Sequence, residues 1–392
     1  MRISINYILL SFFIIGIIFL SKELNFILAS IYLIALMIGN KLKLPYTKRT
    51  KKLSKSIIFL VFVMIISTLI NQNSNPYLIF KDLYQYSYPL IILLIANLIS
   101  KKIDYSNLSK FIIYFSFVLS ILHLLYIIFI LKLNLSLILE DEFDFYYKGI
   151  FQSLGLYFSL KVYLKNKNLF FLIIIFLISI SILFHFSRTS LFFLILALFY
   201  NLKNSSKKFT TLLILISSVF LVSVISDGSK FVEKIKRIPT EIFSFNDFNS
   251  LNIESDKALI NSNWRSYEAF MAINQVITGD SKNIFIGYGL GSLVDLGFYQ
   301  NLGNNSFRYI NKLHNAFAEL FFKSGLIGLM IIIIFSYNLA FNFSKFSNFT
   351  VDLKFMGLSL FLSTFVIGGL FSKGELVLFF LFYCLLFFKE NK

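Results

Sequence analysis

The stretch ILFHFSRTSLFFLI, residues 182–195, holds one arginine, Arg188, between two apolar runs. An ionisable residue inside a membrane segment is costly, so such a position usually has a topological or a chemical role. Long apolar runs recur along the chain, and 57% of its 392 residues are hydrophobic. A soluble protein of this size would not hide that much apolar surface. The sequence therefore predicts an all-α, polytopic membrane protein.

The apolar runs and the lysines between them predict a topology. We expect about 12 transmembrane helices, at residues 4–21, 25–40, 55–71, 83–100, 110–131, 149–164, 169–186, 189–202, 209–226, 314–341, 355–371 and 375–388. With the N-terminus in the cytoplasm, the basic breaks 41–54 and 203–208 fall inside, as the positive-inside rule requires. This distribution accounts for the net charge of +17, so the lipid bilayer rather than nucleic acid is the expected partner.

The longest polar stretch divides the chain into three segments. Residues 1–226 would hold the first nine spans, 227–313 a periplasmic loop unit, and 314–392 the last three spans. Two amphipathic stretches lie in the loop, KFVEKIKRIPT (230–240) and NSNWRSYEAFMAINQVITG (261–279). Their periodicity predicts that the loop is mostly helical and packs on the outer membrane face.

Two arginines are candidates for binding an anion at that face. Arg188 lies in a short turn at the outer end of the span 169–186, and no other lysine or arginine shares the turn. It could bind a ligand, or it could anchor the helix by reaching the membrane surface. Arg265 lies in the second amphipathic stretch, three residues before Glu268. It could also bind a ligand, or form a surface salt bridge of little energetic value.

Three histidines occur in the chain, and His314 has the most suggestive position. It opens the span 314–341 at its outer mouth, is followed by Asn315, and precedes Glu319 by about one turn. A neutral imidazole at a water-accessible helix start can accept a proton near neutral pH. A purely structural role stays open for it. His123 is expected to pack against a neighbouring helix, and His185 could face the membrane interface.

Two other motifs have weaker chemical signals. GYGLGS (287–292) follows no clear strand and precedes no Lys-Ser/Thr, so a nucleotide site is not favoured. Its glycines would permit a tight turn or a close approach of backbone to a ligand. EDEFD (140–144) is expected to be a solvated outer loop, with a divalent-metal site as the alternative. Cys384 is the only cysteine, which excludes disulfides within the chain and cysteine metal sites.

The candidate residues share one location, the outer membrane boundary. Arginine captures phosphate oxygens in a bidentate manner. An anion with its tail in the bilayer and its head at the outer surface would match two arginines and a histidine placed there. A lipid-linked pyrophosphate is such a molecule.

Four motifs, taken in chain order, resemble the O-antigen ligase and polymerase superfamily of bacterial envelopes. They are SRTS (187–190), WRSYEAFMAI (264–273), GYGLGS (287–292) and LHNAFAELFFKSGLIGLM (313–330). The His-Asn pair followed by SGLIG is the most specific of them. The resemblance covers residues 150–340 closely, whereas the rest matches only in span count and in the position of the large loop.

This resemblance implies a metal-independent, cofactor-free glycosyltransferase of the bacterial inner membrane, with its active site facing the periplasm. It implies that Arg188 and Arg265 hold the pyrophosphate of an undecaprenyl-pyrophosphate-linked oligosaccharide. His314 would orient or deprotonate the hydroxyl of an acceptor glycolipid. The residues expected to support substrate binding are Tyr288, Asn315 and Glu319.

Several activities remain open at the level of sequence. We favour an O-antigen polymerase, which would extend a lipid-linked repeat unit and could work with a chain-length regulator. An O-antigen ligase, which transfers the finished glycan to lipid A–core, would share its donor, fold and site. A polysaccharide flippase would instead have charges deep in a central cavity, and often inverted repeats or helices broken near the midplane. A structural membrane protein without activity is the remaining alternative.

Overall fold

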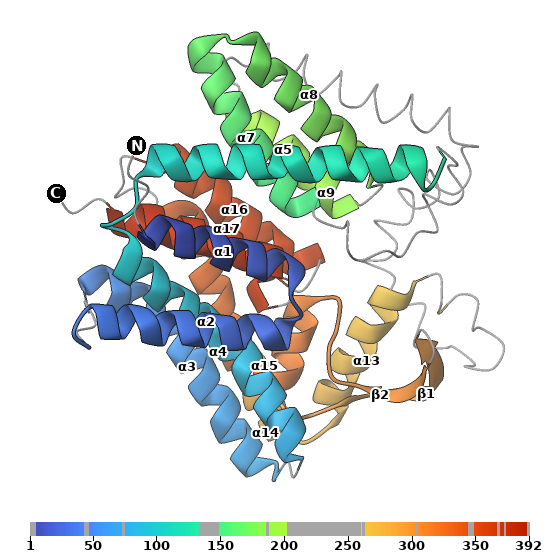
Figure 1. Cartoon of the computed structure of the whole chain (residues 1–392). Coiled ribbons are helices and arrows are strands. Elements are labelled where there is room, and N and C mark those ends of the chain that lie inside the picture. Colours follow the sequence, from blue (N-terminus) through green and yellow to red (C-terminus); the bar gives the residue numbers. More distant parts are fainter. Residues whose placement is uncertain are drawn as a thin grey trace.

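The computed structural model of the protein (Figure 1) describes residues 5–42, 47–72, 75–132, 149–185, 188–201, 260, 263–302, 305–343, 349–366, 369–371 and 374–389. Within these ranges the chain forms helices and one β-hairpin. The first group of helices is α1 (Ile5–Phe19), α2 (Lys22–Gly39), α3 (Lys48–Ile70), α4 (Pro76–Ile99), α5 (Tyr105–Phe129), α7 (Gly149–Asn166), α8 (Leu169–Phe184) and α9 (Arg188–Asn201). The remaining elements are α13 (Trp264–Thr278), α14 (Ser281–Ile286), β1 (Val294–Leu302), β2 (Asn305–Ile310), α15 (Ala316–Tyr337), the π-helix η2 (Asn338–Asn342), α16 (Thr350–Val366), the 3₁₀ turn η4 (Gly369–Phe371) and α17 (Gly374–Lys389).

Every predicted span except 209–226 coincides with a described helix. The span 209–226, the amphipathic stretch 230–240 and the acidic run 140–144 lie outside the described residues. By length and composition, four of the described helices could cross a membrane: Lys48–Ile70, Pro76–Ile99, Tyr105–Phe129 and Ala316–Asn342. Shorter apolar helices accompany them at Ile8–Phe19, Glu23–Gly39, Leu169–Phe184 and Thr189–Asn201. The mostly helical architecture is confirmed, four of its helices suit a membrane by length and composition, and the number of spans stays a prediction.

The helix α2 shows how the sequence sorts its apolar side chains. Ile27, Ile31, Ile34 and Ile38 recur at helical spacing, and all of them are exposed. Ala29, on the opposite face, is fully buried in the core. A stripe of this size facing water would be an aggregation liability. Lipid tails would remove that cost, so this stripe is the face of α2 that suits contact with a bilayer.

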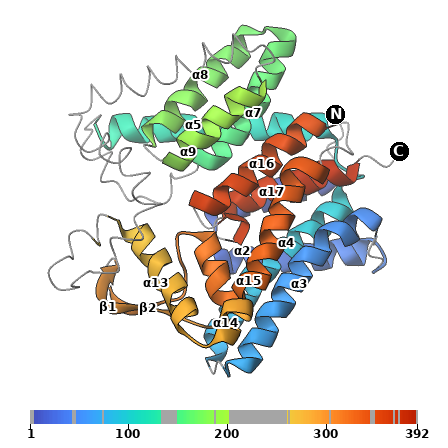
Figure 2. The ribbon, with the colours of Figure 1, turned by 180° about the vertical axis from the view of Figure 1, so that it is seen from behind.

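Helices from both ends of the chain share one core. In Figure 2, α16 and α17 lie between α7 and α9 above and α3 and α4 below. Tyr157 of α7 stacks on Phe355 of α16 with ring centroids 4.1 Å apart. The Tyr157 hydroxyl donates a hydrogen bond of 2.5 Å to Asp352. The described helices of segments 1–226 and 314–392 are therefore packed together, although the loop unit separates these segments in sequence.

The loop unit, which we define as α13, α14, β1 and β2, has a small core of its own. It lies on the side of the molecule away from both termini (Figures 1 and 2). Val294 and Leu296 of β1 pack with Tyr267 of α13 and with Phe322 of α15. The prediction of a mostly helical loop missed the hairpin. The apolar residues at 294, 296 and 298 alternate with a period of two, which is typical of a half-buried strand.

Candidate active site

His314 is held by a carboxylate that comes from a different element. Its ring Nδ1 lies 2.8 Å from Oε2 of Glu268, and its backbone N–H donates to the same oxygen over 3.2 Å. A carboxylate accepts hydrogen bonds, so Nδ1 carries the proton and Nε2 is the acceptor of the neutral ring. The His314 side chain is 52% exposed, whereas that of Glu268 is 3% exposed. The arrangement is a half-exposed imidazole oriented by a buried carboxylate, which suits a general base.

Glu268 was missed as a site residue in the sequence, where it was considered only as a partner for Arg265. It lies on α13 and its side chain is buried, so it is no surface group. Arg265 lies on the same helix three residues earlier, and its side chain is exposed. Their spacing places Arg265 about one turn from the carboxylate that holds His314. A meeting of the Arg265 side chain with His314 stays a prediction.

Asn315 and Glu319 both secure the beginning of α15. The Asn315 side chain caps the helix, because its Oδ1 accepts the backbone N–H groups of Phe317 and Ala318 over 2.9 and 3.2 Å. Glu319 is buried and accepts the Leu313 backbone N–H over 3.1 Å. The hydroxyl of Tyr86, on α4, donates to the same carboxyl group over 2.6 Å. Both residues are engaged in holding the turn before His314, and their contacts with substrate stay predictions.

Tyr288 lies between the loop unit and α15. Its hydroxyl donates to the backbone carbonyl of Gln275 over 2.8 Å. Its ring packs against Phe322 with centroids 5.0 Å apart. These contacts fasten the segment 287–292 to α13, and a contact of Tyr288 with substrate stays a prediction.

The GYGLGS segment approaches the protein backbone very closely. The helix α15 is broken at Gly325, which has φ 61° and ψ −163°. The backbone N–H groups of Tyr288 and Gly289 donate to the carbonyls of Phe322 and Lys323, just before the break, over 2.8 and 2.9 Å. Gly289 has φ +85°, and a Cβ there would lie 2.4 Å from the backbone nitrogen of Thr68 in α3. These glycines bring the segment close to the backbone of α3 and α15, and the expected approach of backbone to a ligand stays a prediction.

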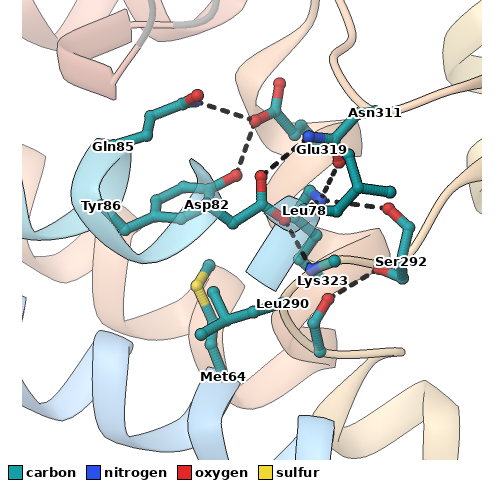
Figure 3. Close-up of polar contacts among 12 residues, drawn as sticks. Met64, Leu78, Asp82, Gln85, Tyr86, Leu290, Ser292, Asn311, Glu319 and Lys323 are labelled. Atoms are coloured by element: carbon teal, nitrogen blue, oxygen red, sulfur yellow. Dashed lines mark hydrogen bonds and ion pairs between the residues drawn. The ribbon is translucent and has the colours of Figure 1, made fainter. Parts of the chain in front are cut away.

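A buried ion pair lies beneath this segment (Figure 3). The Lys323 ammonium donates to Asp82 Oδ2 over 2.5 Å, to Asn311 Oδ1 over 2.8 Å and to the Ser292 carbonyl over 3.2 Å. Asp82 also accepts the Asn311 amide over 3.0 Å and the Gly291 backbone N–H over 2.8 Å. Lys323 and Asp82 are each 1% exposed. The sequence pattern did not identify Asp82, which lies one residue before the predicted span 83–100.

Arg188 begins α9, and its side chain lies outside what the structure describes. Its expected convergence with Arg265 and His314 therefore stays a prediction. His185, three residues earlier, is buried and does not face the interface as expected. Its ring stacks on that of His123 at a centroid distance of 4.0 Å, and its Nε2 lies 3.0 Å from Gln152 Oε1. His123 packs against the neighbouring helix α8, as expected, with Nδ1 2.9 Å from the Ser181 hydroxyl.

Within the described ranges, no group of three or more histidine, cysteine, aspartate or glutamate residues could hold a metal ion. Cys384 is a buried, free thiol in α17. Comparisons with models of protein families, with curated proteins and with solved structures find no match to this chain. Its function therefore has to be argued from the geometry around His314.

Proposed function

We propose that the protein is a glycosyltransferase of the bacterial inner membrane. It would take a glycan from an undecaprenyl-pyrophosphate-linked donor and transfer it to a lipid-linked repeat unit, as an O-antigen polymerase does. The observation that carries the proposal is the hydrogen bond of 2.8 Å between His314 Nδ1 and the buried carboxylate of Glu268. It leaves a half-exposed imidazole whose Nε2 can accept a proton from an acceptor hydroxyl.

The proposed reaction needs a base for the acceptor hydroxyl and positive charge beside the leaving group. The acceptor hydroxyl oxygen attacks the anomeric carbon, and the bond from that carbon to pyrophosphate breaks. The hydroxyl proton passes to Nε2 of His314, and the negative charge of Glu268 stabilises the imidazolium that results. Undecaprenyl pyrophosphate leaves with the bonding electron pair, so no acid is required to protonate it. Arg265 and Arg188 would neutralise the charge that develops on the leaving group.

Purified protein in lipid vesicles with an undecaprenyl-pyrophosphate-linked repeat unit tests this proposal. We expect the wild type to form longer lipid-linked glycans, and His314→Ala and Arg265→Lys to lose most of this activity. Lysine is a point charge and cannot reproduce the bidentate geometry of a guanidinium group. Lys282→Ala is the matched control, since Lys282 is an exposed cation of the same loop unit. Full activity of both His314→Ala and Arg265→Lys would disprove the proposal.

The acceptor distinguishes a polymerase from a ligase. A ligase would use lipid A–core in the same assay and leave lipid-linked repeats unextended. We favour the polymerase because the chain is rich in Ile, Phe and Lys and has the compact GYGLGS segment. In cells, loss of a polymerase leaves core capped by a single repeat, whereas loss of a ligase leaves bare core.

The break in α15 at Gly325 is the one feature of the described structure that a transporter would share. Broken helices in transporters expose carbonyl groups to an ion or substrate near the midplane. Here the carbonyls of Phe322 and Lys323 accept N–H groups of the 287–292 segment. That segment contacts Thr68, which is two residues from the end of α3. The break therefore lies near the end of a helix that could span the membrane, and not near its middle, where transporters have such breaks. Movement of the intact donor across vesicles without glycan transfer would support the transporter instead.

A further inference from the structure

The segment that carries His314 connects β2 to α15 and has no regular structure of its own. It is nevertheless fastened along its length. Asn311 bonds Asp82 and Lys323, the Leu313 N–H bonds Glu319, and His314 bonds Glu268. These partners come from α4, α15 and α13, which are far apart in sequence. The position of the imidazole therefore depends on what holds this connecting segment.

The anchor at Asn311 is a closed ring of polar contacts. The Asn311 amide donates to Asp82 Oδ1, its carbonyl accepts from Lys323, and Lys323 donates to Asp82 Oδ2. Lys323 has three donors, and its third bond goes to the Ser292 carbonyl. Because each group in the ring has a defined partner, the orientation of the Asn311 amide is determined.

The helix α4 contributes side chains that bond both Asn311 and Glu319. Asp82 holds Asn311, while Gln85 and Tyr86, three and four residues later, hold Glu319. Residues at this spacing lie on one helix face. Figure 3 shows these side chains converging with Lys323 and Asn311. Because α4 holds the segment that carries His314, it helps to set the distance between His314 and Glu268 of α13.

A buried ion pair is a poor device for stability, because desolvation offsets much of the attraction. It can fix the position of the groups that it bonds, since few other side chains could make the same set of hydrogen bonds. We infer that Asp82, Lys323 and Asn311 are positioning residues, which hold the connecting segment so that His314 meets Glu268 in one geometry. This inference rests on the proposed function.

The test uses Asn311→Ala, which detaches the segment but leaves the pair of Lys323 and Asp82 intact. We expect a fall in kcat of about tenfold, as for small misplacements of a catalytic group, with KM unchanged. Hydrogen exchange of the backbone amides at 311–314 should become faster. Asn274→Ala is the matched control, because Asn274 is an exposed asparagine of the loop unit. It should change neither kcat nor the exchange of these amides.

The two readouts separate this inference from the proposed function. Faster exchange at 311–314 with an unchanged kcat would overturn the positioning role, as would unchanged exchange. If His314→Ala and Arg265→Lys were both as active as the wild type, the proposed function would fail. The exchange measurement would then still decide whether the bonds of Asn311 to Asp82 and Lys323 hold the segment.

Discussion

His314 donates to one oxygen of Glu268 twice, from its ring and from its backbone. In Glu268→Gln the amide oxygen can still accept these bonds, but the negative charge that would stabilise an imidazolium is gone. We expect glycan transfer to fall by about a hundredfold, the lower range for loss of general-base function. Thermal stability should change little. The rate of glycan transfer and the melting temperature, measured on the same preparation, check this prediction. A large fall in the melting temperature together with the loss of transfer would point to misfolding instead.

The ion pair of Lys323 and Asp82 predicts non-additive effects on stability. Lys323→Met alone leaves an unpaired carboxylate that is 1% exposed, which costs about 3–5 kcal/mol. Lys323→Met combined with Asp82→Leu removes both charges, so the free energy of unfolding should fall by less than in either single variant. Chemical unfolding in detergent measures the cycle. Lys282→Met, at an exposed lysine, is the control. Additive losses would contradict the prediction.

At the scale of elements, the GYGLGS segment depends on its glycines. Gly289 has φ +85°, and its Cβ position meets the backbone of Thr68. Gly289→Ala should therefore lower the free energy of unfolding by about 2 kcal/mol or more. Gly39→Ala is the matched control, because nothing lies within 4 Å of a Cβ at Gly39. Alanine there should be neutral or slightly stabilising. Equal effects at the two sites would disprove this reading.

The hairpin contains a titratable ion pair. The hydrogen bonds of Arg308, 2.9 Å each, hold the pKa of Asp295 below its ordinary value. A lowered folded-state pKa contributes stability above the unfolded pKa, and this stability is lost as pH falls through the folded one. The protection factors of the hairpin amides, which correct exchange rates for their intrinsic pH dependence, should therefore fall below about pH 4. Arg308→Gln should remove most of this dependence, and an unchanged profile in that variant would contradict the assignment.

At the scale of the molecule, the loop unit and the termini lie on opposite sides (Figure 1). The topology predicts a periplasmic loop unit and cytoplasmic basic breaks. Cys384 is buried, so an introduced cysteine should dominate labelling. We expect a membrane-impermeant maleimide to label Lys282→Cys in cells with a permeable outer membrane. Lys51→Cys, in a basic break, should be labelled only after the inner membrane is opened. The reverse pattern would invert the topology.

The sequence predicted the helices well, but it did not predict the hairpin or the residues that hold His314. The apolar spans coincide with helices because membrane helices need long apolar runs, and each run is a local property. The hairpin was missed because a nine-residue strand beside amphipathic helices has a weak local signal. His314 was identified from its place at a helix start. Glu268, Asp82 and Asn311 were not identified as parts of its support, since their partners lie on other elements.

By itself, the sequence determined the helical, membrane-type architecture, since chain segments of this hydropathy and length need no distant contact to be recognised. It also pointed to His314, Arg265 and Arg188 as candidates. Only the tertiary structure decided that His314 bonds Glu268 of α13 and that a buried ion pair between α4 and α15 anchors the connecting segment. Such pairings depend on how packed helices bring remote residues together, and no local pattern encodes them.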